Sequence, residues 1–280
     1  MTRRQRPAVI DGERTLNERV RDFWESEPNG TAPSVAPRPG SDRRAWFDAI
    51  EARRYELEPF IHAAAQFPRY RGKAVLEVGV GVGTDHLQWA RAGALCHGVD
   101  ITAAAVALTA EHLDLYGFQS DLRVIDAETL PFPDETFDVV YSWGVIHHAE
   151  QPGRIVEEIY RVLVPGGSFI GMVYARHSMV ALKLWIKHGL LKLRPQRTFA
   201  ELIWEHMESV GTKAYTPGEA RSLFHRFDDL QVDQIATPYD RSRLPGFLAR
   251  LVPGWFGWFL VVHATKASAP TGTSSRTPGA

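Results

Sequence analysis

Short apolar runs alternate with amphipathic stretches along the chain from residue 73 onward. The runs have the length of buried strands, and the stretches between them place apolar residues at helical spacing. This alternation is typical of a parallel sheet with helices on both faces. We therefore predict strands at 73–78, 95–99, 121–125, 137–142, 168–174, 229–235 and 257–265, with helices at 84–92, 102–116, 153–163, 178–192 and 217–226.

Two further helices are expected before the first strand. Apolar residues between Leu16 and Trp24 recur at helical spacing, and Pro28-Asn29-Gly30 then breaks the pattern. A second helix is predicted over 42–67. Together these elements form an N-terminal helical cap at 15–70, in front of the main domain at 71–266.

The stretch 174–215 interrupts the alternation. It is too long for an ordinary loop between a helix and a strand, and it carries helical patterns of its own. It follows a strand at the carboxyl edge of the predicted sheet, where open α/β sheets bind ligands. We predict a helical lid insertion there, which together with the helix around Trp24 covers the substrate.

The amino-acid composition is that of a globular protein. The chain has 280 residues, 44% of them hydrophobic, which is enough for a sizeable core. The two ends, 1–14 and 267–280, are poor in apolar residues, and we predict disorder there. The net charge of −1 gives no long-range field to gather nucleic acid or an anionic membrane.

Targeting and redox features favour the cytoplasm. Cys96 is the single cysteine, so neither an internal disulfide nor a cysteine-rich zinc site is expected. No apolar run follows the N-terminal arginines, so no signal peptide is predicted. The apolar stretch 255–264 is about half of what a membrane-spanning helix needs and is interpreted as a buried strand.

Three alternating glycines follow the first predicted strand, at Gly79, Gly81 and Gly83. Glycines there let the backbone turn sharply and approach a ligand, and the next helix offers free N–H groups. A dinucleotide fingerprint needs glycines at 79, 81 and 84, or at 81, 83 and 86, and this chain has Thr84 and His86 instead. NAD binding is therefore disfavoured.

The spacing Glu77-Val-Gly-Val-Gly-Val-Gly83 resembles the first motif of the class I S-adenosylmethionine (SAM) dependent methyltransferases. The segments 130–142 and 161–167 resemble the type 11, ubiquinone-biosynthesis branch of that family, and the likeness spans 73–174. It implies a Rossmann-like seven-stranded α/β sheet of order 3-2-1-4-5-7-6 with an antiparallel last strand.

The resemblance also implies a SAM site. The three glycines, Gly79, Gly81 and Gly83, give the cofactor's tail and ribose room. Asp100, at the end of the second strand, accepts hydrogen bonds from the ribose hydroxyls. Asp126, after the third strand, accepts from the adenine amine.

Five more residues complete this expected cofactor site. Ile101 and Ala127 sandwich the adenine ring. Glu77, an acid inside a buried strand, needs a partner, and in the family an acid there commonly meets the cofactor's ammonium. Ser142 and Trp143 line the methionine end.

A pair of histidines follows the fourth strand, at the edge that faces the transferred methyl group. His147 or His148 is a candidate general base, because an imidazole titrates near neutral pH. We favour His148, and we expect the rate to rise with pH through the imidazole pKa. His177, His188 and His206 in the insertion are alternative bases. No carboxylate or cysteine cluster accompanies the pair, so no metal site is predicted.

Aromatic and apolar residues of the N-terminal helix and of the insertion are candidates for the substrate wall. Such a wall suits an aromatic, terpenoid, polyketide or lipid acceptor better than a phosphate or a nucleic acid, which would need basic residues. The candidates are Phe23, Trp24, Tyr174, Met179, Trp185, Phe199, Ile203 and Trp204.

The sequence thus predicts a stand-alone methyltransferase that modifies a hydrophobic small molecule of secondary metabolism. Attack by oxygen, nitrogen or carbon is left open. The alternatives are a quinone or lipid methyltransferase of core metabolism and a SAM-binding protein without turnover. A homo-oligomer formed through the N-terminal segment is also possible.

Overall fold

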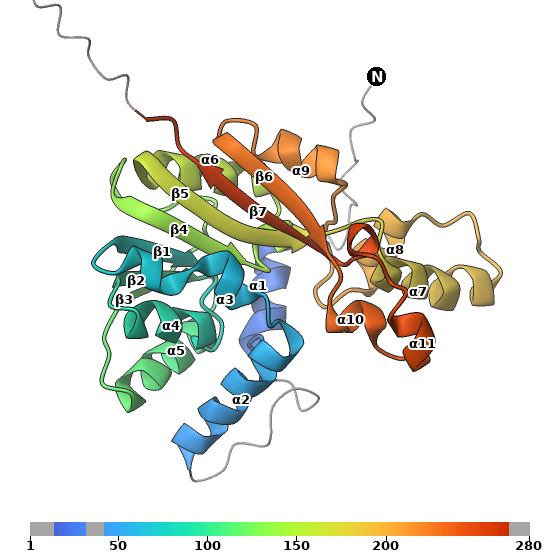
Figure 1. Ribbon diagram of the computed structural model, residues 1–280, viewed down its shortest axis with the longest axis horizontal. Coiled ribbons are helices and arrows are strands. Elements are labelled where there is room, and N and C mark those ends of the chain that lie inside the picture. The colour runs from blue at the N-terminus through green and yellow to red at the C-terminus, as the bar shows by residue number, and fades with distance from the viewer. Residues whose placement is uncertain (1–13, 32–41, 269–280) are drawn as a thin grey trace, which may run out of the picture.

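A computed structural model describes residues 14–31 and 42–268. Most of both predicted disordered ends, 1–14 and 267–280, lies outside these residues. The described chain forms a seven-stranded sheet with the order β3-β2-β1-β4-β5-β7-β6 (Figure 1). The strands are β1 Ala74–Val78, β2 Leu95–Asp100, β3 Asp121–Val124, β4 Phe137–Trp143, β5 Leu163–Tyr174, β6 Asp228–Ile235 and β7 Phe259–Thr265.

Strands β3, β2, β1, β4 and β5 pair in parallel, as the alternation with helices predicts. β7 lies between β5 and β6 and is antiparallel to both. The expected strand order and the antiparallel last strand are therefore confirmed.

The sheet is covered on both faces, which makes three layers (Figure 1). Successive strand residues alternate between two cores. On β4, for example, Val140 packs with α6 and α9, whereas Val139 and Tyr141 pack with α3 and α4. The helices up to β5 are α1 Leu16–Ser26, α2 Arg43–Leu57, α3 Ile61–Ala65, α4 Thr84–Arg91, α5 Ala103–Leu115 and α6 Pro152–Val162.

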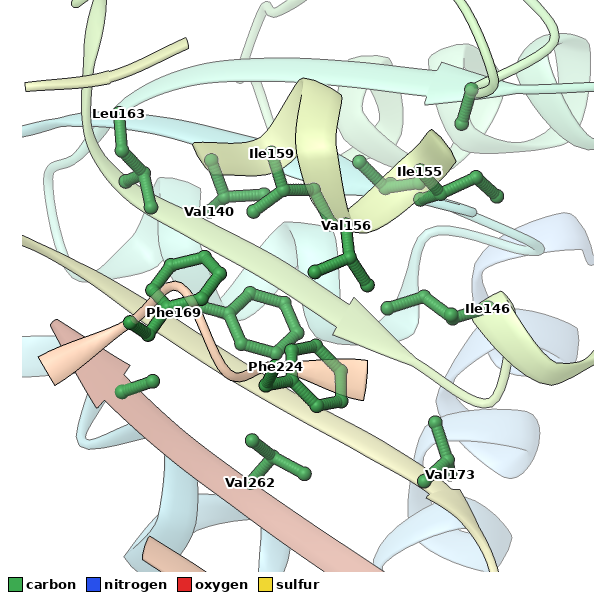
Figure 2. Packing of buried hydrophobic residues seen from close by; sticks show 14 of the residues in the cluster. Val140, Ile146, Ile155, Val156, Ile159, Leu163, Phe169, Val173, Phe224 and Val262 are labelled. Atoms are coloured by element: carbon green, nitrogen blue, oxygen red, sulfur yellow. The ribbon is translucent and has the colours of Figure 1, made fainter. Parts of the chain in front are cut away.

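The core between α6 and the sheet shows why these segments fold together. Ile155, Val156 and Ile159 recur at helical spacing on α6, are buried, and face β4 and β5 (Figure 2). The rings of Phe169 and Phe224 stack beside them at 5.1 Å between centroids. Burial of each such side chain contributes about 1.5–3 kcal/mol.

The predicted insertion after β5 contains two helices, and further short helices follow it. No helix of the described ranges is long and apolar enough to cross a membrane. The remaining helices are α7 Met179–His188, α8 Phe199–His206, α9 Pro217–Leu223, α10 Pro238–Arg241 and α11 Gly246–Ala249, and the 3-10 turns are η1 Phe67–Tyr70, η2 Ile146–His148, η3 Leu190–Lys192 and η4 Gly254–Phe256.

Some element boundaries differ from the sequence-based expectation. The single helix predicted over 42–67 is two helices, because Pro59 disfavours helical backbone at the residue before it and α2 ends at Leu57. Gln66, with φ 49°, then ends α3. The segment between β6 and β7, for which we predicted no helix, contains α10, α11 and η4.

Candidate cofactor cleft and active site

The turn between β1 and α4 holds the three predicted glycines, all with positive φ. Gly79 has φ 84°, and a Cβ atom there would lie 2.1 Å from a methyl carbon of Val145. A Cβ on Gly83 would lie 2.9 Å from the methyl carbon of Thr109. These positions therefore require glycine both for backbone conformation and for space.

Asp100 ends β2 beside this turn. One carboxylate oxygen accepts a hydrogen bond from the backbone N–H of Gly81 at 3.2 Å, and the other accepts from the N–H and the hydroxyl of Thr102. Burial nevertheless raises the pKa of Asp100 above its usual value, against the effect of these donors. The carboxylate thus joins the glycine turn to the start of α5.

A cleft of about 810 Å³, partly open to solvent, lies along the carboxyl ends of β1, β2 and β4. The residues that line it without having been predicted for the cofactor include Asn17, Val20, Trp24 and His148. The predicted cofactor residues that line it are Gly79, Gly81, Asp100, Ile101, Asp126, Ala127 and Trp143.

Three predicted cofactor residues lie outside this cleft. Gly83 caps α4 behind the turn. Ser142 is fully buried in β4, and its hydroxyl oxygen has no hydrogen-bond partner among the described residues. Glu77 lies 3.0 Å from Nδ1 of His86 and lines a second cavity. Burial raises the pKa of Glu77 and lowers that of His86 to about 3.

The second cavity, of about 690 Å³, shares Gly79, Gly81 and Trp143 with the first. Part of its polar wall, including Arg54, comes from α2, which the sequence analysis did not connect with a site. Arg54 of α2 pairs with Asp85 at 2.7 Å and with Glu58 at 3.1 Å.

Further donors complete the network around these two acids. Asp85 accepts from the hydroxyls of Tyr55 and Tyr141 at 3.0 and 2.9 Å. Glu58 accepts from the indole N–H of Trp143 at 2.7 Å. Burial opposes the charge of Arg54, but Asp85 and Glu58 hold its pKa well above the ordinary value.

Helix α1 is held against the cleft by polar contacts at both ends. Near its start, the side-chain amide of Asn17 donates to Asp126 at 2.9 Å and to Glu128 at 2.8 Å. Near its end, Glu25 accepts from the backbone N–H groups of Ala103 and Ala104, at the N-terminus of α5. α1 therefore covers the expected cofactor site.

The two histidines of η2 differ in their surroundings. Nδ1 of His148 lies 2.8 Å from the hydroxyl of Ser209 and 3.1 Å from that of Thr212, and the ring lines the first cleft. Burial, with a smaller effect of Lys213, lowers the pKa of His148 to about 3.

His147 lies deeper than its neighbour. The side chain is fully buried, and neither ring nitrogen has a hydrogen-bond partner among the described residues. Its ring lies 3.9 Å from that of Tyr174, between centroids, and does not line the cleft. Burial lowers the pKa of His147 well below its usual value. Of the two predicted bases, the geometry favours His148.

Comparison with known proteins agrees with this arrangement. The family model described as a methyltransferase domain matches residues 76–171, which include the glycine turn, Asp100 and Asp126. The chain carries a methyltransferase domain at residues 76–171.

Curated relatives match this methyltransferase domain over part of their length. Phosphatidylethanolamine N-methyltransferase of Cereibacter sphaeroides is 36% identical over 102 residues, which cover 36% of this chain and 50% of that protein. Ubiquinone biosynthesis O-methyltransferase of Pseudomonas putida is 32% identical over 129 residues, covering 45% and 56%. The chain thus spans about half the length of these relatives.

Solved structures share the methyltransferase fold. Magnesium protoporphyrin IX methyltransferase from Synechocystis, solved with bound SAH, gives a TM-score of 0.58 at 16% identity and covers 90% of this chain and 100% of that one. The [4+2]-cyclase SpnF gives 0.53 at 18% identity, covering 82% and 85%. At these identities the likeness supports the fold alone.

The residues predicted for the substrate wall are dispersed in the structure. Only Trp24 lines either of the two cavities, and its ring meets that of His148 edge-on at 5.6 Å. Ile203 is fully buried in the core, and Tyr174 stacks on Trp258. The others lie away from both cavities, on α1 or the insertion: Phe23, Met179, Trp185, Phe199 and Trp204.

The alternative bases of the insertion, His177, His188 and His206, line neither cavity. The ring of His188 stacks on that of His206 at 3.9 Å. Among the described residues, no group of three His, Cys, Asp or Glu side chains is arranged to hold a metal ion.

Proposed function

We propose that this methyltransferase transfers the methyl group of SAM to a hydrophobic small molecule, such as an aromatic, terpenoid or polyketide-like compound. The observation that carries the proposal is a single cleft in which the glycine turn, Asp100 and Asp126 face Trp24 and His148.

The donor set of the cleft fits SAM. Asp100 offers carboxylate oxygens to vicinal hydroxyls, and Asp126 offers them to an exocyclic amine. Gly79 and Gly81 line the cleft with positive φ, a backbone conformation that glycine adopts readily and that lets the turn approach a bound tail closely. The second cavity, with Arg54 and Glu77 in its wall, joins this cleft at the glycine turn and offers charged partners for the amino-acid end.

Bound SAM supplies a methyl group activated by its sulfonium. The chain's own residues then have three tasks, which are to hold the acceptor in line, to exclude water and, for a hydroxyl acceptor, to remove a proton. Val20 and Trp24 shield the cleft, and His148 is placed to take the proton.

Asp100→Ala is expected to weaken SAM binding about ten- to a hundredfold, because buried hydroxyls left unpaired cost roughly 1–3 kcal/mol. Calorimetric titration with SAM and with its demethylated product measures this loss. Asp114→Ala removes an exposed carboxylate from α5 and serves as the control. Equal affinities of the two variants would refute the ribose assignment.

The function itself is tested by incubating the chain with isotopically labelled SAM and a panel of acceptors, with products read by mass spectrometry. We expect label in an aromatic, terpenoid or polyketide-like acceptor. Label confined to quinones or lipids would support the core-metabolic alternative, to which the named relatives belong. SAM binding without transfer to any acceptor would favour a non-catalytic SAM-binding protein.

A further inference from the structure

Large apolar side chains are exposed at one end of the molecule. Their exposed fractions run from 70% to 90%. Singly exposed apolar residues are normal, but several together mark an interaction surface. They come from the turn after α7 and from the segment around α11: Leu191, Leu193, Phe247, Leu251 and Trp255.

These two segments belong to one end of the fold. The ammonium of Lys183 in α7 donates to the backbone carbonyls of Tyr239, Asp240 and Ser242, at 2.7–3.0 Å. Figure 1 shows α7, α10 and α11 together beyond the carboxyl end of β5. We call residues 186–194 and 241–255 the basic apolar surface.

The charged residues of the basic apolar surface are all Lys or Arg. Segments 176–198 and 241–258 contain nine Lys and Arg residues and no Asp or Glu. Arg197 pairs with Glu201 and Glu205 of α8, and Arg176 pairs with Glu219. The six cations of the basic apolar surface have no ion pair among the described residues: Lys187, Lys192, Arg194, Arg241, Arg243 and Arg250.

Because the whole chain has a net charge of −1, the rest of it is net acidic. The charge distribution therefore orients the molecule with this end toward an anionic surface. A second copy of the chain would bring the same cations together, which is unfavourable. Exposed, bulky apolar side chains flanked by basic residues are typical of protein segments that insert into the interface of an anionic membrane.

We propose that the basic apolar surface docks the protein on an anionic lipid membrane. The apolar tips insert among the lipid chains, and the free cations contact the headgroups. The docked end lies at the carboxyl edge of the sheet, as the cofactor cleft does. The inference goes beyond the proposed function and does not depend on it, because lipid binding is measured without turnover.

Cosedimentation of the full chain with vesicles tests the proposal. We expect binding to vesicles of phosphatidylcholine mixed with phosphatidylglycerol, and much weaker binding to phosphatidylcholine alone or at high salt. Phe247→Ser/Leu251→Ser and Lys192→Glu/Arg250→Glu should each weaken binding about tenfold or more. These side chains are exposed, so folding is expected to survive.

Matched controls come from the rest of the surface. Leu95→Ser removes a leucine that is 60% exposed at the opposite edge of the sheet, and Arg154→Glu reverses an exposed charge on α6. Both should bind like the wild type. Absence of vesicle binding, equal losses in the controls, or a dimer in sedimentation velocity that Phe247→Ser/Leu251→Ser abolishes would overturn the proposal.

Discussion

Arg54→Met is expected to lower the free energy of unfolding by about 3–5 kcal/mol. The guanidinium is the cation that faces both Asp85 and Glu58, whose side chains are only 4% and 6% exposed. Without it, two buried carboxylates keep only the hydroxyl and indole donors around them, and uncompensated charge in a protein interior is costly. Methionine conserves most of the volume, so the loss reports charge pairing more than packing.

Urea denaturation of the wild type and of Arg54→Met measures this difference in the free energy of unfolding. Arg53→Met is the matched control, because Arg53 is the next residue of α2 and pairs only with Glu56 among the described residues, in a surface pair with side chains 40% and 68% exposed. Its loss should be about 1 kcal/mol or less. Similar losses in both variants would contradict the importance assigned to the buried network.

His148→Ala is expected to lower kcat by at least about tenfold and up to about 10²-fold for a hydroxyl or phenol acceptor, the low end for removal of a general base, because a ring with a lowered pKa is a weak base. In the tautomer whose Nδ1–H donates to the hydroxyl of Ser209 or Thr212, Nε2 is the nitrogen that can take a proton. SAM affinity should change little, because the cofactor's polar partners are elsewhere in the cleft.

The pH profile of the proposed transfer is expected to differ from the sequence-based expectation. The sequence alone predicts a rate that rises through the ordinary imidazole pKa. Since burial lowers the pKa of His148 to about 3, the ring is already neutral above that pH, and no limb from it should appear between pH 5 and 8.

Profiles of kcat for wild type, His148→Ala and the exposed control His225→Ala test these statements. A loss below tenfold in a folded His148→Ala protein would indicate that positioning alone drives transfer. A limb near pH 6.5 that His148→Ala removes would show instead that the ring is more hydrated than its burial implies.

The sequence predicts those parts of the fold that depend on a local pattern within one segment. The alternation of apolar runs located all seven strands, but the strand order came from the family resemblance, because periodicity does not say which strands are neighbours. The break in the predicted helix 42–67 could also have been predicted from the sequence, because Pro59 disfavours helical backbone at the residue before it. The helical spacing of apolar residues on both sides of Pro59 led to the prediction of one continuous helix.

The site was predictable to the same extent. Gly79, Asp100 and Asp126 each follow a strand, so their positions alone bring them to one edge. Asn17 reaches Asp126 across 109 positions of sequence, and Arg54 reaches Asp85 across 31. Contacts of that kind depend on how the N-terminal helices pack, which no local pattern encodes.

The position of β7 between β5 and β6 limits the order in which the strands can pair during synthesis. β6 has no hydrogen-bonded neighbour in the sheet other than β7, which is translated after it. During synthesis on the ribosome, the parallel strands around the cofactor cleft can therefore pair early. Until β7 is available, both edges of β6 have no strand to pair with. Only when residues 259–265 emerge does the last strand enter the gap between β5 and β6 and join the two parts of the sheet.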